Sequence, residues 1–281
     1  MEKNAELSRN THCLNCGVPI KGAFCHQCGQ RARDNLDRSL GRLLGEFFGN
    51  VFFLDNRFFL SLWFLIRFPG RMTIEFLDGK RKKFISPVTL YLFFNLIYFF
   101  VNPLTDYSIS LYDQINSQPY SHWVKEWAET RLQEKGVTVQ TFSATYQNAS
   151  DNISKSIMII NIPMIALFIY LIVFKQRKFY FDSLIFAFHF FSFFMFSWIS
   201  VYWIGELIEL MLGTDDSIFS ALVFIAFTFL VPLLYAVLAI KKFMSISWYW
   251  AIPAGLGVTI SVFLVNLCYR LIVFLVTFWS I

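Results

Sequence analysis

Four of the five cysteines in this chain of 281 residues lie near its N-terminus, in two CxxC pairs. The pairs are Cys13 with Cys16 and Cys25 with Cys28, and a glycine follows each pair. Thiolates bind zinc, and two such pairs supply the four ligands of a closed tetrahedral site. Glycine admits the left-handed backbone that a tight turn needs. The spacing therefore predicts a zinc ribbon with one structural Zn²⁺ per chain, against the alternative of four unrelated buried thiols.

The predicted ribbon is not expected to be catalytic. Catalytic zinc normally has three protein ligands and an open position for water, whereas four cysteines close the shell. His12 and His26 are surplus to that set, and we expect both at the surface. The chain also lacks the HExxH, GxSxG and P-loop patterns, so nothing in it indicates an enzyme. Because Lys21 is the one cation between Cys13 and Cys28, no nucleic acid is expected as a partner.

The rest of the composition is typical of a membrane protein. Hydrophobic residues make up 56% of the chain and charged residues 15%, whereas soluble proteins carry about 25% charged residues. We therefore predict an all-α, multi-pass transmembrane bundle of about five spans. The expected spans lie near residues 86–104, 157–175, 183–205, 218–240 and 248–276.

Three regions are expected along the chain. Residues 1–35 form the cytosolic zinc ribbon, residues 36–85 form amphipathic or interfacial helices with a basic juxtamembrane segment, and residues 86–281 form the bundle. Within the bundle, residues 104–156 form an extracytoplasmic loop. Apolar residues recur at helical spacing over 36–53, which favours a helix in the membrane interface or packed on another helix, or a flexible interfacial segment.

Charge sets the expected orientation. Four consecutive cations precede the first span and are predicted to contact lipid headgroups: Lys80, Arg81, Lys82 and Lys83. Basic and acidic connections then alternate along the chain, and residues 1–35 contain no apolar signal segment. By the positive-inside rule the N-terminus is cytosolic and the C-terminus extracytoplasmic. Arg270 is expected to reach the outer interface, with the tail after it lying along the membrane surface.

Polar residues inside the spans give a candidate binding site, because polar groups are costly in a membrane. The candidates are His189, Ser192, Asn95, Asn161 and Asn266. Together they could bind a lipid headgroup or small solute, or pass protons. The alternative is that His189 forms a hydrogen bond across a helix interface, as polar residues in bundles commonly do.

Three stretches together resemble one protein family. They are residues 13–30 (CLNCGVPIKGAFCHQCGQ), 69–87 (PGRMTIEFLDGKRKKFISP) and 180–196 (YFDSLIFAFHFFSFFMF). The chain resembles the DUF3667 family of uncharacterised bacterial membrane proteins, mostly from Bacteroidota, over most of residues 10–200. The resemblance implies a bacterial inner-membrane protein with an N-terminal zinc ribbon and implies no activity. Asp182-Ser183 stands where the family often has an acid-His pair, which argues against a two-histidine site.

These observations favour a membrane scaffold or regulatory protein. The zinc ribbon would bind a protein partner on the cytosolic side, or a second copy of the chain through the N-terminal region, while membrane lipids surround the bundle. The alternative function is a transporter or lipid-binding protein with its polar site around His189.

Overall fold

The computed structural model describes residues 12–32, 56–101, 109–134, 136–174, 179–212 and 226–281. Over these residues the chain is helical, and the two isolated β-bridges of the N-terminal unit are its only extended pairing. The predicted all-α fold is therefore confirmed. The helix expected over 36–53 lies outside the described residues.

Four helical segments are long and apolar enough to cross a membrane. The first joins α7 (Val139–Ile157), the 3₁₀ turn η2 (Met158–Ile160) and α8 (Asn161–Val173). The others are α9 (Tyr180–Leu212), the π-helix η4 (Ala226–Leu230) continued by α11 (Val231–Met244), and α12 (Trp248–Ser280). The first expected span, 86–104, corresponds to the shorter apolar helix α4 (Pro87–Val101).

Helix α9 is the centre of the bundle. It contacts α4 and α8 most extensively and is the most buried of the four long apolar segments. Its phenylalanines interleave with aromatic rings of the neighbouring helices, as where Phe193 stacks on Tyr235 of α11 with ring centroids 3.7 Å apart. The abundance of Phe in the sequence is thus explained by packing, because rings fill the spaces between helices.

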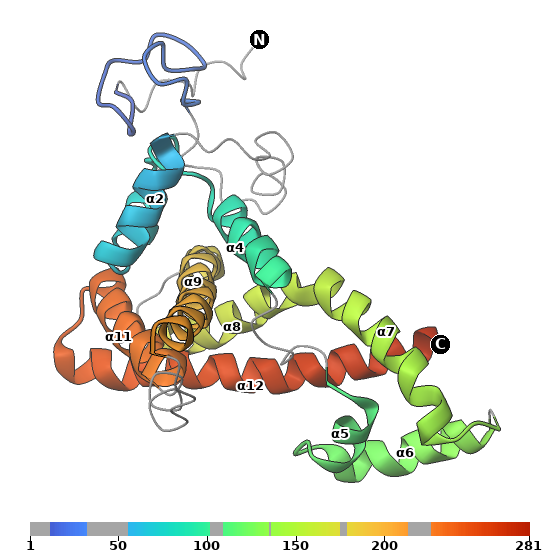
Figure 1. The fold of residues 1–281 in the computed structure, drawn as a ribbon. Coiled ribbons are helices and arrows are strands. Elements are labelled where there is room, and N and C mark those ends of the chain that lie inside the picture. The colour runs from blue at the N-terminus through green and yellow to red at the C-terminus, as the bar shows by residue number, and fades with distance from the viewer. Residues whose placement is uncertain (1–11, 33–55, 102–108, 135, 175–178, 213–225) are drawn as a thin grey trace, which may run out of the picture.

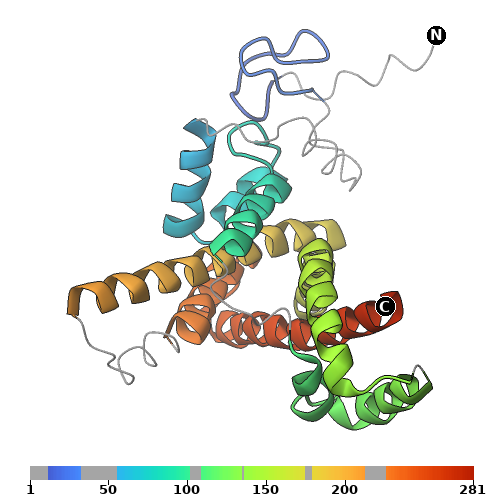
Figure 2. The same ribbon diagram turned by 45° about the vertical axis from the view of Figure 1, so that its right-hand side comes forward.

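One end of the bundle carries two short helices, α2 (Asn56–Arg67) and α3 (Arg71–Leu77). Helix α2 buries Phe58 and Leu65 but exposes Phe59 and Trp63, one turn apart on another face. An exposed apolar face on a helix too short to cross a bilayer suits the membrane interface. In Figures 1 and 2 the N-terminal unit, in blue, lies at this same end beside α2.

The opposite end is a second helical layer made by α5 (Leu111–Asn116), α6 (Ser121–Glu134) and the first half of α7. Its small core includes Phe274 and Phe278 from the end of α12, and Figure 1 shows that end running beside α7. Arg270 lies 3.4 Å (Nη1 to Oε1) from Gln118 of this layer. The tail after Arg270 continues α12, and its Phe274 and Phe278 are buried against α6 and α7.

Candidate functional site

The four N-terminal cysteines converge on one point. Their Sγ atoms all lie within 4.8 Å of one another, and all four are free thiols. The Sγ atoms of Cys13 and Cys28 are 3.6 Å apart, and those of Cys16 and Cys25 are 3.5 Å apart. Four thiolates at the ordinary zinc–sulfur distance of about 2.3 Å from one tetrahedral ion would be about 3.8 Å apart. The donor set therefore fits a closed four-sulfur metal centre.

The two CxxC pairs form matching turns. In the first, the backbone N–H of Cys13 donates to Val18 O and that of Gly17 donates to Cys13 O. The second turn repeats this pattern: the backbone N–H of Cys25 donates to Gln30 O, and that of Gly29 donates to Cys25 O. Gly17 and Gly29 have φ of 81° and 69°, the left-handed conformation that a side chain would strain. Local spacing alone therefore shapes each half of the centre.

Backbone N–H groups are directed at the thiols. Those of Cys28 and Gln27 donate to Cys25 and lower the pKa of its thiol to about 6, against burial, which raises it. At Cys16, donation from Val18 lowers the pKa, but burial and the three neighbouring thiols raise it to about 12. Opposite shifts in adjacent thiols are expected without a cation, because four thiolates so close together repel one another. A bound cation would hold all four thiolates, which is structural rather than catalytic chemistry.

The outer surface of this metal-ligating unit is partly apolar. Phe24 is 63% exposed and Leu14 is 37% exposed, and each lies beside a cysteine. His12 and His26 are exposed, as expected. A surface phenylalanine on so small a unit is a contact site available to another molecule.

A buried side chain of the same unit bonds to the helical part of the chain. Gln30, directly after the second CxxC turn and its glycine, is 3% exposed, and its amide Nε2 donates to Gly79 O at 2.6 Å. Gly79 lies in the turn after α3. The four-cysteine unit is thus held against the segment that leads into α4.

A buried carboxylate organises that segment. The Glu75 side chain is 7% exposed and pairs with Lys83, with Arg71 at 3.0 Å (Nε to Oε1) and with Lys80 at 3.8 Å (Nζ to Oε2). Burial raises the pKa of Glu75, but the hydrogen bonds from Lys83 and Arg71 and the charges of Lys83 and Lys80 outweigh burial and lower it. Glu75 was not among the residues singled out from the sequence, although its place four residues after Arg71 on a helix indicates an ion pair.

The basic run before α4 is therefore largely occupied by contacts within the protein. Lys80 and Lys83 face Glu75, and the guanidinium of Arg81 lies 5.3 Å from the ring centroid of Phe76. Lys82 is exposed. Of the four residues expected to contact lipid headgroups, Lys82 is the one whose side chain has neither an ion pair nor a cation–π contact among the described residues.

The intramembrane polar residues do not form one hydrogen-bonded cluster. His189 is 3% exposed, and its Nδ1 lies 2.9 Å from Thr73 Oγ1 on α3. Ser192 donates to the carbonyl of Phe188 in its own helix, and Asn95 donates to Tyr91 and Met158. Asn161 is buried and Asn266 is half-buried, and in the described chain no hydrogen bond joins either one to His189. The bond from His189 to Thr73 is of the cross-helix kind that the sequence left open as the alternative.

At the end of the bundle that carries α2 and α3, the hydrogen bonds and ion pairs described above centre on residues 61–85. A family model covers the same part of the chain. The model described as "Protein of unknown function (DUF3667)" matches residues 55–99. Over this segment the chain is similar to the DUF3667 family. The matched segment runs from α2 almost to the end of α4 and includes Glu75, Thr73 and Gly79. No curated protein and no solved structure matches the chain.

Proposed function

We propose that this protein is a membrane-anchored scaffold or regulator whose zinc ribbon binds a protein partner on the cytosolic side. The observation that carries the proposal is the closed four-thiol centre with exposed Phe24 and Leu14 beside its ligands. A closed metal centre performs no reaction, but it can fold a unit too small to have its own core. What such a unit offers is a surface. Zinc is the proposed metal because four thiolates in a tetrahedral set favour it.

The packing of the two ends supports the proposed orientation. The turn that leads from α11 into α12 lies against the α2–α3 turn, on the side of the ribbon, whereas the end of α12 packs on α5–α7. If α4 and the four longer helical segments each cross the membrane once, the ribbon and the α11–α12 turn lie on the same side of the membrane. The C-terminus then lies on the other side. Cations gather at the first side, which by the positive-inside rule is the cytosol.

The proposal is tested by native mass spectrometry of the full chain gently extracted from its own membrane. The wild type should retain zinc together with a second polypeptide, either a partner or another copy. Phe24→Ser should keep the zinc and lose the polypeptide, because it removes surface and no ligand. Cys25→Ser with Cys28→Ser should lose both. A polypeptide retained at wild-type level by all variants would contradict the proposal.

A second function is lipid or solute binding within the bundle. It is favoured by buried polar atoms that have no hydrogen-bond partner among the described residues. His189 Nε2 and both amide atoms of Asn161 are buried and have no hydrogen-bond partner among the described residues. Such atoms are costly unless a water or ligand satisfies them. On this hypothesis His189→Ala should lose a lipid or solute that co-purifies with the wild type and should keep the zinc. Retention of every co-purifying small molecule by the variant would count against it.

A further inference from the structure

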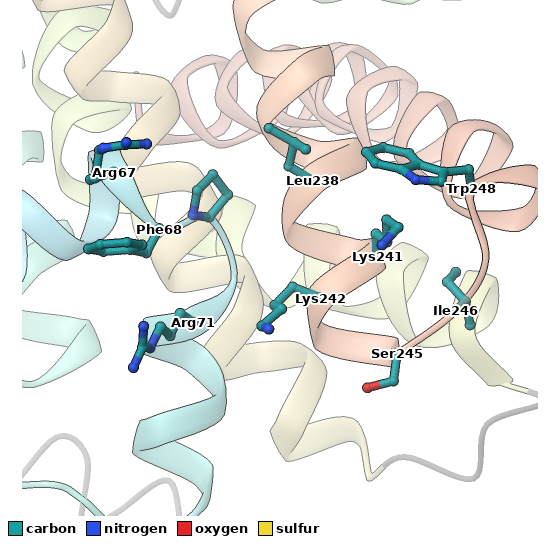
Figure 3. Close-up of a pocket in the computed structure, with 10 residues that line it drawn as sticks. Arg67, Phe68, Arg71, Leu238, Lys241, Lys242, Ser245, Ile246 and Trp248 are labelled. Carbon is teal, nitrogen blue, oxygen red and sulfur yellow. The ribbon is translucent and has the colours of Figure 1, made fainter.

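A pocket of about 530 Å³ lies between the α2–α3 turn and the turn that joins α11 to α12. Its lining residues are shown in Figure 3. Four of them are cations, Arg67, Arg71, Lys241 and Lys242, and none of the lining residues described is acidic. We propose that this basic pocket binds the phosphate group of an anionic membrane lipid. The volume is that of an ordinary small-ligand site.

Most cations of the pocket have no acidic partner among the described residues. Arg67 lies over the ring of Phe68 and Lys241 over the ring of Trp248, and in the described chain neither of these cations nor Lys242 has an acidic partner. In Figure 3 the Lys242 side chain extends from α11 toward the side where Arg71 lies. Cations gathered around one hollow raise the local potential and attract an anion.

Arg71 is held in position to bind an anion. Its Nε donates to Glu75 at 3.0 Å, and its guanidinium lies 5.5 Å from the Phe68 ring centroid. An arginine has five N–H donors, so a bond through Nε leaves the terminal nitrogens available for a phosphate. Glu75 is thus a positioning residue for the pocket as well as the partner of Lys80 and Lys83.

The two walls of the pocket are fixed against each other. Gly70 has φ of 75°, and a Cβ built on it would collide with the carbonyl of Ala239 on α11. The α2–α3 turn can therefore approach α11 closely only because this residue has no side chain. The gap between Arg71 and Lys242 is consequently set by backbone contact and does not need a ligand to form.

The surroundings of the pocket favour a lipid over a soluble phosphate compound. Helix α12 begins with three exposed aromatic residues, Trp248, Tyr249 and Trp250, and Trp248 lines the pocket itself. Exposed tryptophan and tyrosine beside lysine are typical of the level of lipid headgroups. Leu238, also in the lining, is 45% exposed on α11 and gives an acyl chain a place to lie. This inference does not depend on the proposed role of the zinc ribbon.

The test uses the full chain in detergent with equal amounts of phosphatidylglycerol and phosphatidylcholine of matched acyl chains. Native mass spectrometry counts the lipid retained. The wild type should prefer the anionic lipid by roughly tenfold or more, because several cations surround the bound phosphate. Arg67→Ala with Lys242→Ala should abolish the preference. Lys242→Gln, which removes the charge but keeps most of the length and the helix-forming tendency of lysine, should weaken the preference without disturbing the fold.

Two controls separate the pocket from general surface charge. Lys21→Ala removes an exposed cation on the cysteine unit at the same end of the bundle and Lys155→Ala removes one on α7, and both should keep the preference. An equal loss in Lys21→Ala, or an unchanged preference in the double variant, would overturn the proposal. A wild type that binds inorganic phosphate but retains no more phosphatidylglycerol than phosphatidylcholine would overturn the lipid as the source of the phosphate.

Discussion

At the scale of single residues, function and stability depend on two concentrations of charge. One is the set of four thiols at the N-terminus, which repel one another once ionised unless a cation lies among them. The other is Glu75, a buried acid that faces three cations. Gln30 connects the two regions through Gly79, which lies four residues after that acid. Each region gives a prediction of its own.

The first prediction concerns the metal. The purified wild type should contain one zinc per chain, and Cys25→Ser with Cys28→Ser should contain none, because two ligands do not hold a structural ion. Elemental analysis of the purified proteins measures this. Cys268→Ser is the control: this exposed cysteine on α12 is remote from the thiol set, and its removal should leave the zinc content unchanged. A metal-free wild type purified without chelators would contradict the prediction.

The second prediction concerns Glu75. Glu75→Gln should lower the free energy of unfolding by about 1–3 kcal/mol, a discounted value because its cationic partners reach water. Folding lowers the pKa of Glu75 from its ordinary value of 4.5. The carboxylate therefore stabilises the wild type fully when the pH is above 4.5, and this contribution is lost as the pH falls through the lower pKa of the folded state. Thermal unfolding in detergent between neutral pH and pH 3 should therefore show the difference between wild type and variant shrink. Glu129→Gln, at an exposed position on α6, should unfold as the wild type does.

At the scale of elements, the close pairing of α11 with α12 is the most extensive helix–helix contact in the described chain. It depends on Gly255: a Cβ there would lie 2.7 Å from the Cα of Val237. Because that neighbour is backbone, it cannot move aside as a flexible side chain would. The α11–α12 turn also forms one wall of the basic pocket, so the pairing of the two helices shapes that site.

We therefore expect Gly255→Ala to destabilise the protein by about 1–3 kcal/mol through overpacking. Its thermal unfolding midpoint in detergent should fall, and binding of anionic lipid should weaken with it. Gly205→Ala is the matched control, since a Cβ at this helical glycine of α9 meets nothing within 4 Å. Alanine also favours helix by about 1 kcal/mol there. If the two substitutions had equal effects, close packing would not be the reason for the glycine at 255.

The sequence predicted those elements that depend on local spacing. Each CxxC turn is set within six residues, and the long apolar runs correspond to α8, α9, α11 and α12. It did not predict contacts between distant parts of the chain. The pairing of Thr73 with His189 spans 116 residues, and the burial of Phe278 against α6 and α7 depends on how the whole chain folds back on itself. The start of α7 at Val139 was missed because its first half is polar and resembles a loop.

At the scale of the whole molecule, the structure has two unlike ends. One end carries the thiol set, Glu75 and the basic pocket, and the other carries α5, α6 and the end of α12. Figures 1 and 2 both show the N-terminal unit and the α5–α6 layer far apart, on opposite sides of the bundle. The proposed orientation places the first end in the cytosol and the second outside.

This orientation predicts the behaviour of C-terminal reporters. Alkaline phosphatase fused after Ile281 should be active, because it folds only outside the cytosol, and the same fusion after Met244 should be inactive. A fluorescent protein that folds only in the cytosol should give the opposite pattern at the two positions. Activity of the phosphatase at Met244 would mean that the basic pocket faces outward and would contradict the topology.

The central claim, a metal-folded cytosolic surface that binds a protein, is tested most directly by photo-crosslinking in intact cells. A photoreactive amino acid replaces Phe24 in the full chain, and Trp123, 79% exposed on α6 at the other end, gives the control position. A discrete crosslinked polypeptide should form from position 24. The same polypeptide should be absent from position 123, and it should be lost when Cys25→Ser and Cys28→Ser are added. No crosslink at position 24, or one that persists without the two cysteines, would contradict the claim.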